Sequence, residues 1–136
     1  MTKLGSVLRT PKQFIFHYGI YVGDNHVIDN SPHHGGVAFR TIDDFSGNVG
    51  FTITNEPSSL RDGMMRVKRA KDLLGCQYRL LSYNCEHFTN LIVFGRPSSK
   101  QVSHAITCAT LGATVSKRPL FGFCAGAVLG LIAAQT

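Results

Sequence analysis

The clearest hydrophobic pattern is the aromatic and β-branched run FIFHYGIYV at residues 14–22, which ends at a Gly-Asp-Asn sequence at 23–25. A run of this kind beside a turn signal predicts a strand that enters a tight turn and returns over residues 26–29. Short apolar stretches at 37–42 and 49–54 predict two further strands. We therefore expect an antiparallel meander.

A first helix is predicted over residues 60–74. Ser59 and Asp62 form a loose Ser-x-x-Asp capping sequence, and Gly75 stands where a helix terminator is expected. The many basic residues of this segment are expected to face water.

A second helix is signalled more strongly, because Asn84 is a good N-cap and apolar residues recur at helical spacing after it. Gly95 and Pro97 stop the pattern. Cys85 then falls at the first helical position, where unpaired backbone N–H groups and the helix dipole favour a thiolate and could hold an oxyanion. The alternative is a cysteine that is simply packed in the core.

These elements place the chain in the α+β class, and 136 residues suffice for about one domain. We expect a lead segment at residues 1–12, a catalytic domain at 13–100 and a hydrophobic helical tail at 101–136. Within the tail, residues 120–134 carry no charge but are fewer than the roughly 20 that span a bilayer. The tail is either a membrane anchor or a helical hairpin packed on the domain.

The composition and charge limit the classes of partner that the chain is expected to bind. The net charge of +6 is spread along the chain, and neither a basic stripe nor a nucleic-acid reader motif is found, so we expect no nucleic acid. An anionic membrane surface needs less organisation. The N-terminus lacks a signal peptide, which predicts a cytoplasmic protein held at membranes by its tail, with the four cysteines as thiols.

A base for the cysteine is expected on the first strand. His17 lies mid-strand and shares a face with Gly19 and Tyr21, because alternate strand residues point to the same side. Gly19 leaves room beside the imidazole. Tyr21 is placed either to hydrogen-bond near the site or to pack in the core.

The group that orients His17 depends on the register of the hairpin. A three-residue loop at 23–25 pairs Gly19 with Asp29, which then becomes a same-face diagonal neighbour of His17. A two-residue turn instead turns Asp29 away, since a slip of one residue inverts the face. The register is therefore part of the functional hypothesis.

Two segments carry a family resemblance. HYGIYVGDNHVID from His17 and LLSYNCEHFTN from Leu80 resemble the signature blocks of the lecithin retinol acyltransferase-like proteins, which include the phospholipase A and acyltransferase enzymes. The resemblance covers roughly residues 12–95. It implies a circularly permuted papain-like fold in which His17 is the base and Cys85 the nucleophile for acyl transfer from a glycerophospholipid or similar ester.

The chain departs from this family at two places. The enzymes usually carry a second histidine where this chain has Asp29, although a carboxylate can also orient and stabilise an imidazolium. The stretch between Asp29 and Asn84 is also shorter than is usual. The remaining histidines show no standard spacing with a cysteine pair, so we expect neither metal nor cofactor.

The sequence thus predicts a thiol-dependent acyltransferase or phospholipase A-type hydrolase that works through an acyl-Cys85 intermediate. His17 acts as base and acid, Asp29 orients it, and Tyr21 and Asn84 support the site. Two alternatives stay open: a cysteine amidase or peptidase of related fold, and a non-catalytic, membrane-tethered interaction module.

Overall fold

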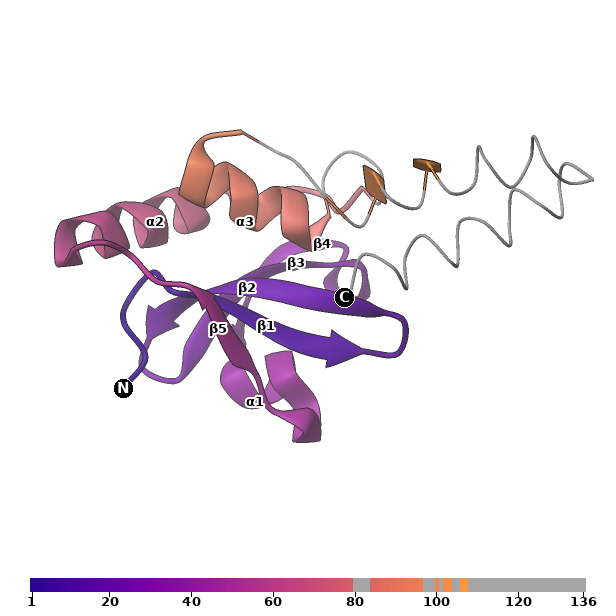
Figure 1. Cartoon of the computed structure of the whole chain (residues 1–136), viewed down its shortest axis with the longest axis horizontal. Coiled ribbons are helices and arrows are strands. Elements are labelled where there is room, and N and C mark those ends of the chain that lie inside the picture. Colours follow the sequence, from indigo (N-terminus) through magenta and orange to yellow (C-terminus); the bar gives the residue numbers. More distant parts are fainter. Residues whose placement is uncertain (80–83, 97–99, 101, 104–105, 108–136) are drawn as a thin grey trace, which may run out of the picture. The chain divides into compact units, whose positions relative to one another are not determined.

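Five strands form one antiparallel sheet in the order β4-β3-β2-β1-β5 (Figure 1). The computed structural model describes residues 1–79, 84–96, 100, 102–103 and 106–107. The strands are β1 (Val7–Lys12), β2 (Ile15–Gly23), β3 (His26–Ser31), β4 (Gly36–Thr41) and β5 (Thr52–Asn55).

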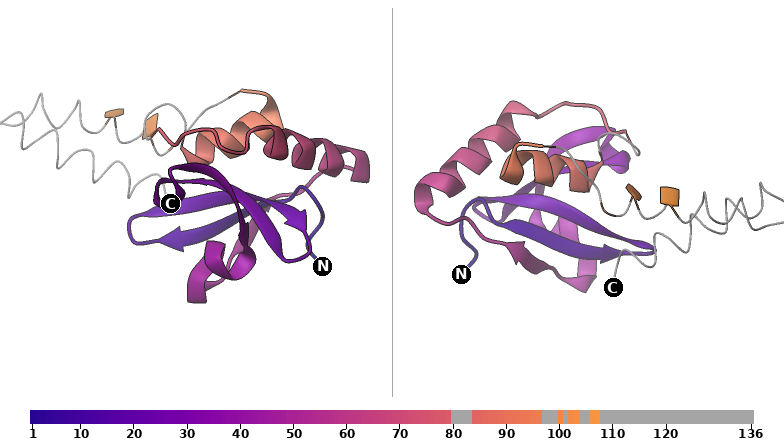
Figure 2. Two further views of the ribbon diagram at one scale, coloured as in Figure 1. Left: turned by 180° about the vertical axis from the view of Figure 1, so that it is seen from behind. Right: turned by 45° about the horizontal axis from the view of Figure 1, so that its top comes forward.

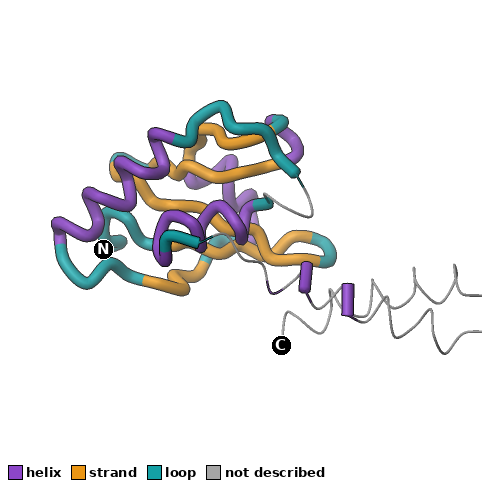
Figure 3. The backbone as a smooth tube through the Cα atoms, turned by 90° about the horizontal axis from the view of Figure 1, so that it is seen from above, coloured by secondary structure: helices purple, strands orange, loops and turns teal. Residues whose placement is uncertain are grey.

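Helices cover both faces of this sheet. They are α1 (Ile42–Ser46), α2 (Leu60–Asp72) and α3 (Cys85–Phe94), with 3-10 turns at Pro32–His34 and Gly47–Val49. Figures 1 and 2 show α2 and α3 over one face and α1 over the other. Seen from above, α2 and α3 lie next to one another across the strands (Figure 3). The expected α+β class is confirmed.

The predicted meander is confirmed for β2, β3 and β4, but β5 does not continue it. β5 lies at the opposite edge of the sheet, where Leu8 of β1 pairs with Ile53. The segment that forms β1 carries no strand signal of its own in the sequence. The reason is that VLRTPK mixes polar, charged and proline residues, and only its position between two strands makes it a sheet member.

Side chains of β2 alternate between two cores, as predicted from the period of two. Ile20 belongs to the larger core under α2 and α3, against which Tyr18 packs. Tyr21 packs against the smaller core of Leu8, Val27 and Phe45 on the α1 side. His17 points toward this second face, because its ring centroid lies 5.3 Å from that of Phe45.

The chain divides into two units, residues 1–11 with 16–98 and residues 12–15 with 99–136. His17, Asp29, Arg40 and Cys85 all belong to the first unit. Across the described residues no helix has the length and apolar character needed to cross a membrane. The apolar stretch 120–134, on which the predicted tail depends, lies outside the described residues.

Gly36 lets the chain after α2 dock on the edge of β4. The Val37 amide donates to the Cys76 carbonyl oxygen at 2.8 Å, and a Cβ on Gly36 would lie 2.0 Å from that oxygen. Gly36→Ala should therefore lower the free energy of unfolding by about 2–3 kcal/mol, measured by urea denaturation.

Gly35→Ala is the matched control for this substitution. A Cβ there meets nothing within 4 Å, and only the left-handed backbone (φ +69) opposes it. Its expected cost is smaller, about 1 kcal/mol. Equal losses at the two positions would show that the contact with Cys76 is not what Gly36 protects.

Candidate active site

His17 is held by a buried carboxylate. The residue is 6% exposed, and its Nε2 lies 2.5 Å from Oδ2 of the fully buried Asp29. A proton on Nε2 that is donated to Asp29 leaves Nδ1 as the basic nitrogen of the neutral ring. The arrangement orients one nitrogen and leaves the other for proton transfer.

The β2–β3 register brings the two residues together. Gly19 pairs with Asp29, as the longer-loop alternative required, but the turn itself is shorter than that alternative supposed. Gly23 pairs with His26 around a two-residue Asp24-Asn25 turn, both residues of which have positive φ. An irregularity between Tyr21 and Gly23 adds the residue that restores the register.

The guanidinium of Arg40 lies beside this pair as a second, largely buried charge. Arg40 of β4 donates through Nε to Oδ1 of Asp29 at 3.1 Å and through Nη2 to Oδ2. It lies on the same face as Asp29 because Ala38, two residues earlier, pairs with Asp29. Burial alone raises the pKa of Asp29, but the hydrogen bonds from His17 and Arg40 outweigh it and hold that pKa below its ordinary value.

Arg40 is a site residue that the sequence pattern did not single out. The signal that could have identified Arg40 is the register of the β3–β4 hairpin, which pairs Asp29 with Ala38. That register depends on residues 32–35, where a 3-10 turn capped by Ser31 precedes a left-handed Gly35. His34 lies on this turn and is exposed, and its Nε2 lies 3.2 Å from Arg40 Nη1.

The N-terminus of α3 positions Cys85 as predicted. Asn84 is the N-cap, and its Oδ1 accepts from the amides of Glu86 and His87, each at 3.0 Å. The backbone N–H of Asn84 donates in turn to His87 Nδ1 at 3.5 Å. Two of the helix amides that were expected to be available for an oxyanion are therefore occupied by the cap.

The environment of the thiol differs from the expectation. Cys85 is 4% exposed, and its Sγ lies 4.0 Å from the carbonyl oxygen of Phe16. Burial raises the pKa of Cys85 to about 12, although hydrogen bonds from the Tyr18 and Glu86 backbone act in the opposite direction. The expected thiolate is thus wrong for this resting state, because desolvation outweighs the helix terminus.

The sulfur nevertheless lies against the backbone of β2 on either side of His17. The two backbone groups that it contacts belong to Phe16 and Tyr18, the residues on either side of His17. The structure therefore brings His17, Asp29 and Arg40 into direct contact and sets Cys85 at the adjoining backbone. Tyr21 packs in the smaller core, in line with the packing alternative.

Loss of the cap should loosen the start of α3. Asn84→Ala removes the acceptor of two amides and should lower the free energy of unfolding by about 1 kcal/mol, measured by urea denaturation. Asn84→Asp is the control, because it keeps the acceptor and should retain most of the stability. Equal stability of the alanine variant and the parent would contradict the structural role given to this cap.

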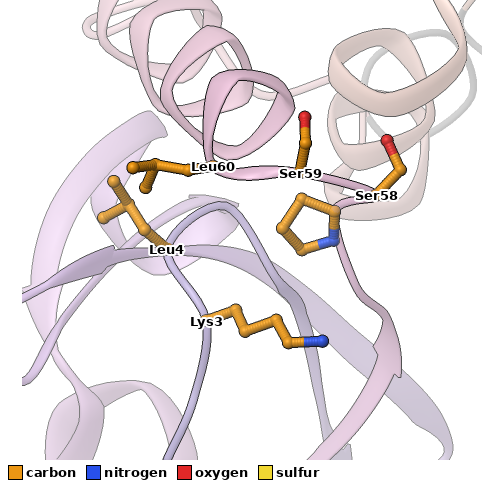
Figure 4. A pocket seen from close by; sticks show the side chains of 6 residues that line it. Lys3, Leu4, Ser58, Ser59 and Leu60 are labelled. Atoms are coloured by element: carbon orange, nitrogen blue, oxygen red, sulfur yellow. The ribbon is translucent and has the colours of Figure 1, made fainter.

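A separate hollow of about 320 Å³ lies between the N-terminal segment and the start of α2 (Figure 4). Leu4 and Leu60 line it beside Ser58 and Ser59, and the Lys3 ammonium is paired with Glu56 at 2.6 Å. None of these residues belongs to the constellation around Cys85. The hollow is therefore not a candidate for the same chemistry.

Known proteins are similar to this chain over most of its length. The family model described as "Lecithin retinol acyltransferase" matches residues 1–98. Human lecithin retinol acyltransferase is 28% identical, over 93% of this chain and 68% of its own length. Human phospholipase A and acyltransferase 3 is 27% identical, over 80% of this chain and 81% of its own. Human phospholipase A and acyltransferase 2 is 26% identical, over 82% of each chain.

Proposed function

The chain belongs to the lecithin retinol acyltransferase family, and from this premise we propose that it transfers or hydrolyses acyl groups of glycerophospholipid esters through an acyl-Cys85 intermediate. The observation that supports this most is the contact of His17 with Asp29, together with the position of Cys85 Sγ 4.0 Å from the carbonyl oxygen of Phe16, the residue before His17. Relatives with the names acyltransferase and phospholipase A supply the substrate class.

The proposed reaction starts from the neutral thiol. Because burial raises the pKa of Cys85 to about 12, almost no thiolate is present at pH 7, so proton transfer to His17 must accompany attack of sulfur on the ester carbonyl. The bond between the carbonyl carbon and the glycerol oxygen then breaks. His17 returns the proton to that oxygen, and a thioester remains.

The second half of the reaction releases the acyl group. Water, an amine or a lipid hydroxyl gives its proton to His17 and attacks the thioester, and Cys85 leaves as the thiol. Water yields a hydrolase and the other acceptors yield a transferase. In both halves Asp29 stabilises the imidazolium that forms on His17.

The rest of the expected architecture is proposed with this activity. The base at position 17 precedes the nucleophile at 85 in the chain, which supports a circularly permuted papain-like arrangement. Boundaries of the catalytic domain at residues 13 and 100, and membrane association through 101–136 on the cytoplasmic side, stay predictions. The tail would hold the site where lipid is concentrated.

The direct test is to trap the intermediate. The full chain is incubated with phosphatidylcholine carrying a labelled acyl group, and peptides are searched by mass for acyl-Cys85. Cys76, a half-buried thiol outside the site, serves as the internal control. An adduct at Cys85 alone, lost in Cys85→Ala, is expected. A folded protein without any adduct would favour the non-catalytic module, which the burial of the thiol also supports.

The resting thiol should resist alkylation. Iodoacetamide reacts with thiolate, and a pKa of about 12 instead of 9.0 reduces the thiolate at pH 7 about a thousandfold. We expect Cys85 to be modified at least tenfold more slowly in the folded chain than in urea, measured by peptide mass. Rapid modification of the folded chain at pH 7 would mean that the thiol is ionised and accessible.

A further inference from the structure

A cavity of about 250 Å³ adjoins the strand that carries His17, and the mechanism above does not use it. Arg9 of β1 and Phe16 of β2 line it together with Phe51, Thr52 and their neighbours at residues 49–50. Arg9 is the charged residue of this lining. The cavity is otherwise formed by aromatic, aliphatic and small polar groups, a setting in which a fixed charge selects an ion of opposite sign.

The Phe16 ring holds the Arg9 side chain in place, but one of the hydrogen-bond donors of Arg9 has no partner among the described residues. Its guanidinium carbon lies 4.2 Å from the centroid of the Phe16 ring, so the planar group is stacked and oriented before any ligand arrives. Its Nε is buried and has no hydrogen-bond partner among the described residues. A buried donor without a partner calls for a ligand, ion or water at that place.

The same residues connect the cavity with the proposed nucleophile. The carbonyl oxygen of Phe16 lies 4.0 Å from Cys85 Sγ, while the Phe16 ring lines the cavity. Tyr18 interacts with both Arg9 and Cys85. Burial and Glu86 raise the pKa of Tyr18, the charge and hydrogen bond of Arg9 lower it, and Cys85 raises it slightly. Arg9 and Cys85 thus both act on Tyr18, the residue that follows His17.

We propose that Arg9 and this cavity bind the phosphate of the glycerophospholipid whose ester is presented to Cys85. This assignment rests on the proposed function, because it names a substrate contact for that site. Guanidinium groups bind phosphate with paired N–H donors. In a glycerophospholipid five or six covalent bonds separate phosphorus from the ester carbonyl carbon, about 6–8 Å when extended, and a phosphate held at Arg9 would leave the ester to extend toward Cys85.

The test measures binding rather than turnover. Full-length Cys85→Ala protein is titrated calorimetrically with monomeric dihexanoylphosphatidylcholine and with uncharged dihexanoylglycerol. The phospholipid should bind more tightly, and adding Arg9→Met should weaken its binding at least tenfold while affecting the neutral lipid less. Lys71→Met is the matched control, since it removes one charge from an exposed position on α2 and should leave both affinities unchanged.

Further arms of the titration separate the sources of phosphate. Inorganic phosphate should compete with the phospholipid in the parent but not in Arg9→Met. Binding of inorganic phosphate without binding of the phospholipid would overturn the assignment to a lipid headgroup. Equal affinities for the two lipids, or the same loss in Arg9→Met and Lys71→Met, would overturn the site itself.

Arg9→Lys guards against misfolding of the methionine variant. Lysine keeps the charge but lacks the planar stacking group, so an intermediate loss of phospholipid affinity is expected. Parent affinity in Arg9→Lys would contradict a role for the stacked guanidinium. Because all arms use Cys85→Ala, an inactive enzyme that binds phospholipid through Arg9 refutes only the proposed function. An active enzyme without this binding refutes only the phosphate site.

Discussion

Replacing His17 by glutamine should lower kcat/KM for a phospholipid ester at least a thousandfold, measured by release of a labelled acyl chain. In many cysteine enzymes a preformed thiolate retains some reactivity without its base. Here burial raises the pKa of Cys85 to about 12, so the thiol keeps its proton until a base removes it. His17 is the base proposed for this transfer, and the thioester should not form without it.

The control for this prediction is His26→Gln. His26 lies on β3 with its ring stacked on Phe39 at 4.8 Å and its Nδ1 near the Asp24 carbonyl, away from the proposed chemistry. Its replacement should change kcat/KM less than threefold. If His17→Gln kept more than a tenth of the parent activity while Cys85→Ala had none, the proton would have to leave by another route.

Local sequence was sufficient to predict the elements that hold the candidate site. The FIFHYGIYV alternation predicted the strand and the face of His17, and Asn84 with Gly95 predicted both ends of α3. The hairpin of β2 and β3 also followed from a local turn signal, but its register was left open between two alternatives. These features depend on neighbours in the chain, for which turn chemistry and capping are strong signals.

Features that depend on distant segments were not predictable in this way. β1 has a weak strand pattern and is defined by its partners β2 and β5. Arg40 reaches Asp29 across a second hairpin whose 3-10 turn sets the register. The burial of Cys85 results from the packing of α3 on the sheet, so the sequence suggested a thiolate where the fold produces a protonated thiol.

Asp29→Asn should have two separable effects, one on stability and one on catalysis. The side chain of Arg40 is 12% exposed and bonds to Asp29 through two nitrogens, so the variant leaves a largely buried cation without its counter-charge. We expect a loss of about 3–5 kcal/mol in the free energy of unfolding at pH 7. We also expect kcat to fall by about 10²–10⁴, because a neutral amide no longer stabilises the imidazolium.

The stability effect should depend on pH in one direction. The pKa of Asp29 in the folded chain lies below its ordinary value of 3.8, so its contribution is fully present above about pH 4 and is lost as the pH falls through the lowered pKa. Asp29→Asn abolishes this titration. Urea denaturation should therefore show a smaller difference between parent and variant at pH 2 than at pH 7.

The double variant Asp29→Asn/Arg40→Met separates the two effects. Removing both charges leaves no buried ion unpaired, so most of the lost stability should return, since replacing a whole buried pair is often nearly neutral. Activity should not return, because the imidazolium on His17 still lacks a carboxylate at the place where Oδ2 lies 2.5 Å from Nε2. Recovery of kcat together with stability would instead mean that Asp29 serves only to compensate the charge of Arg40.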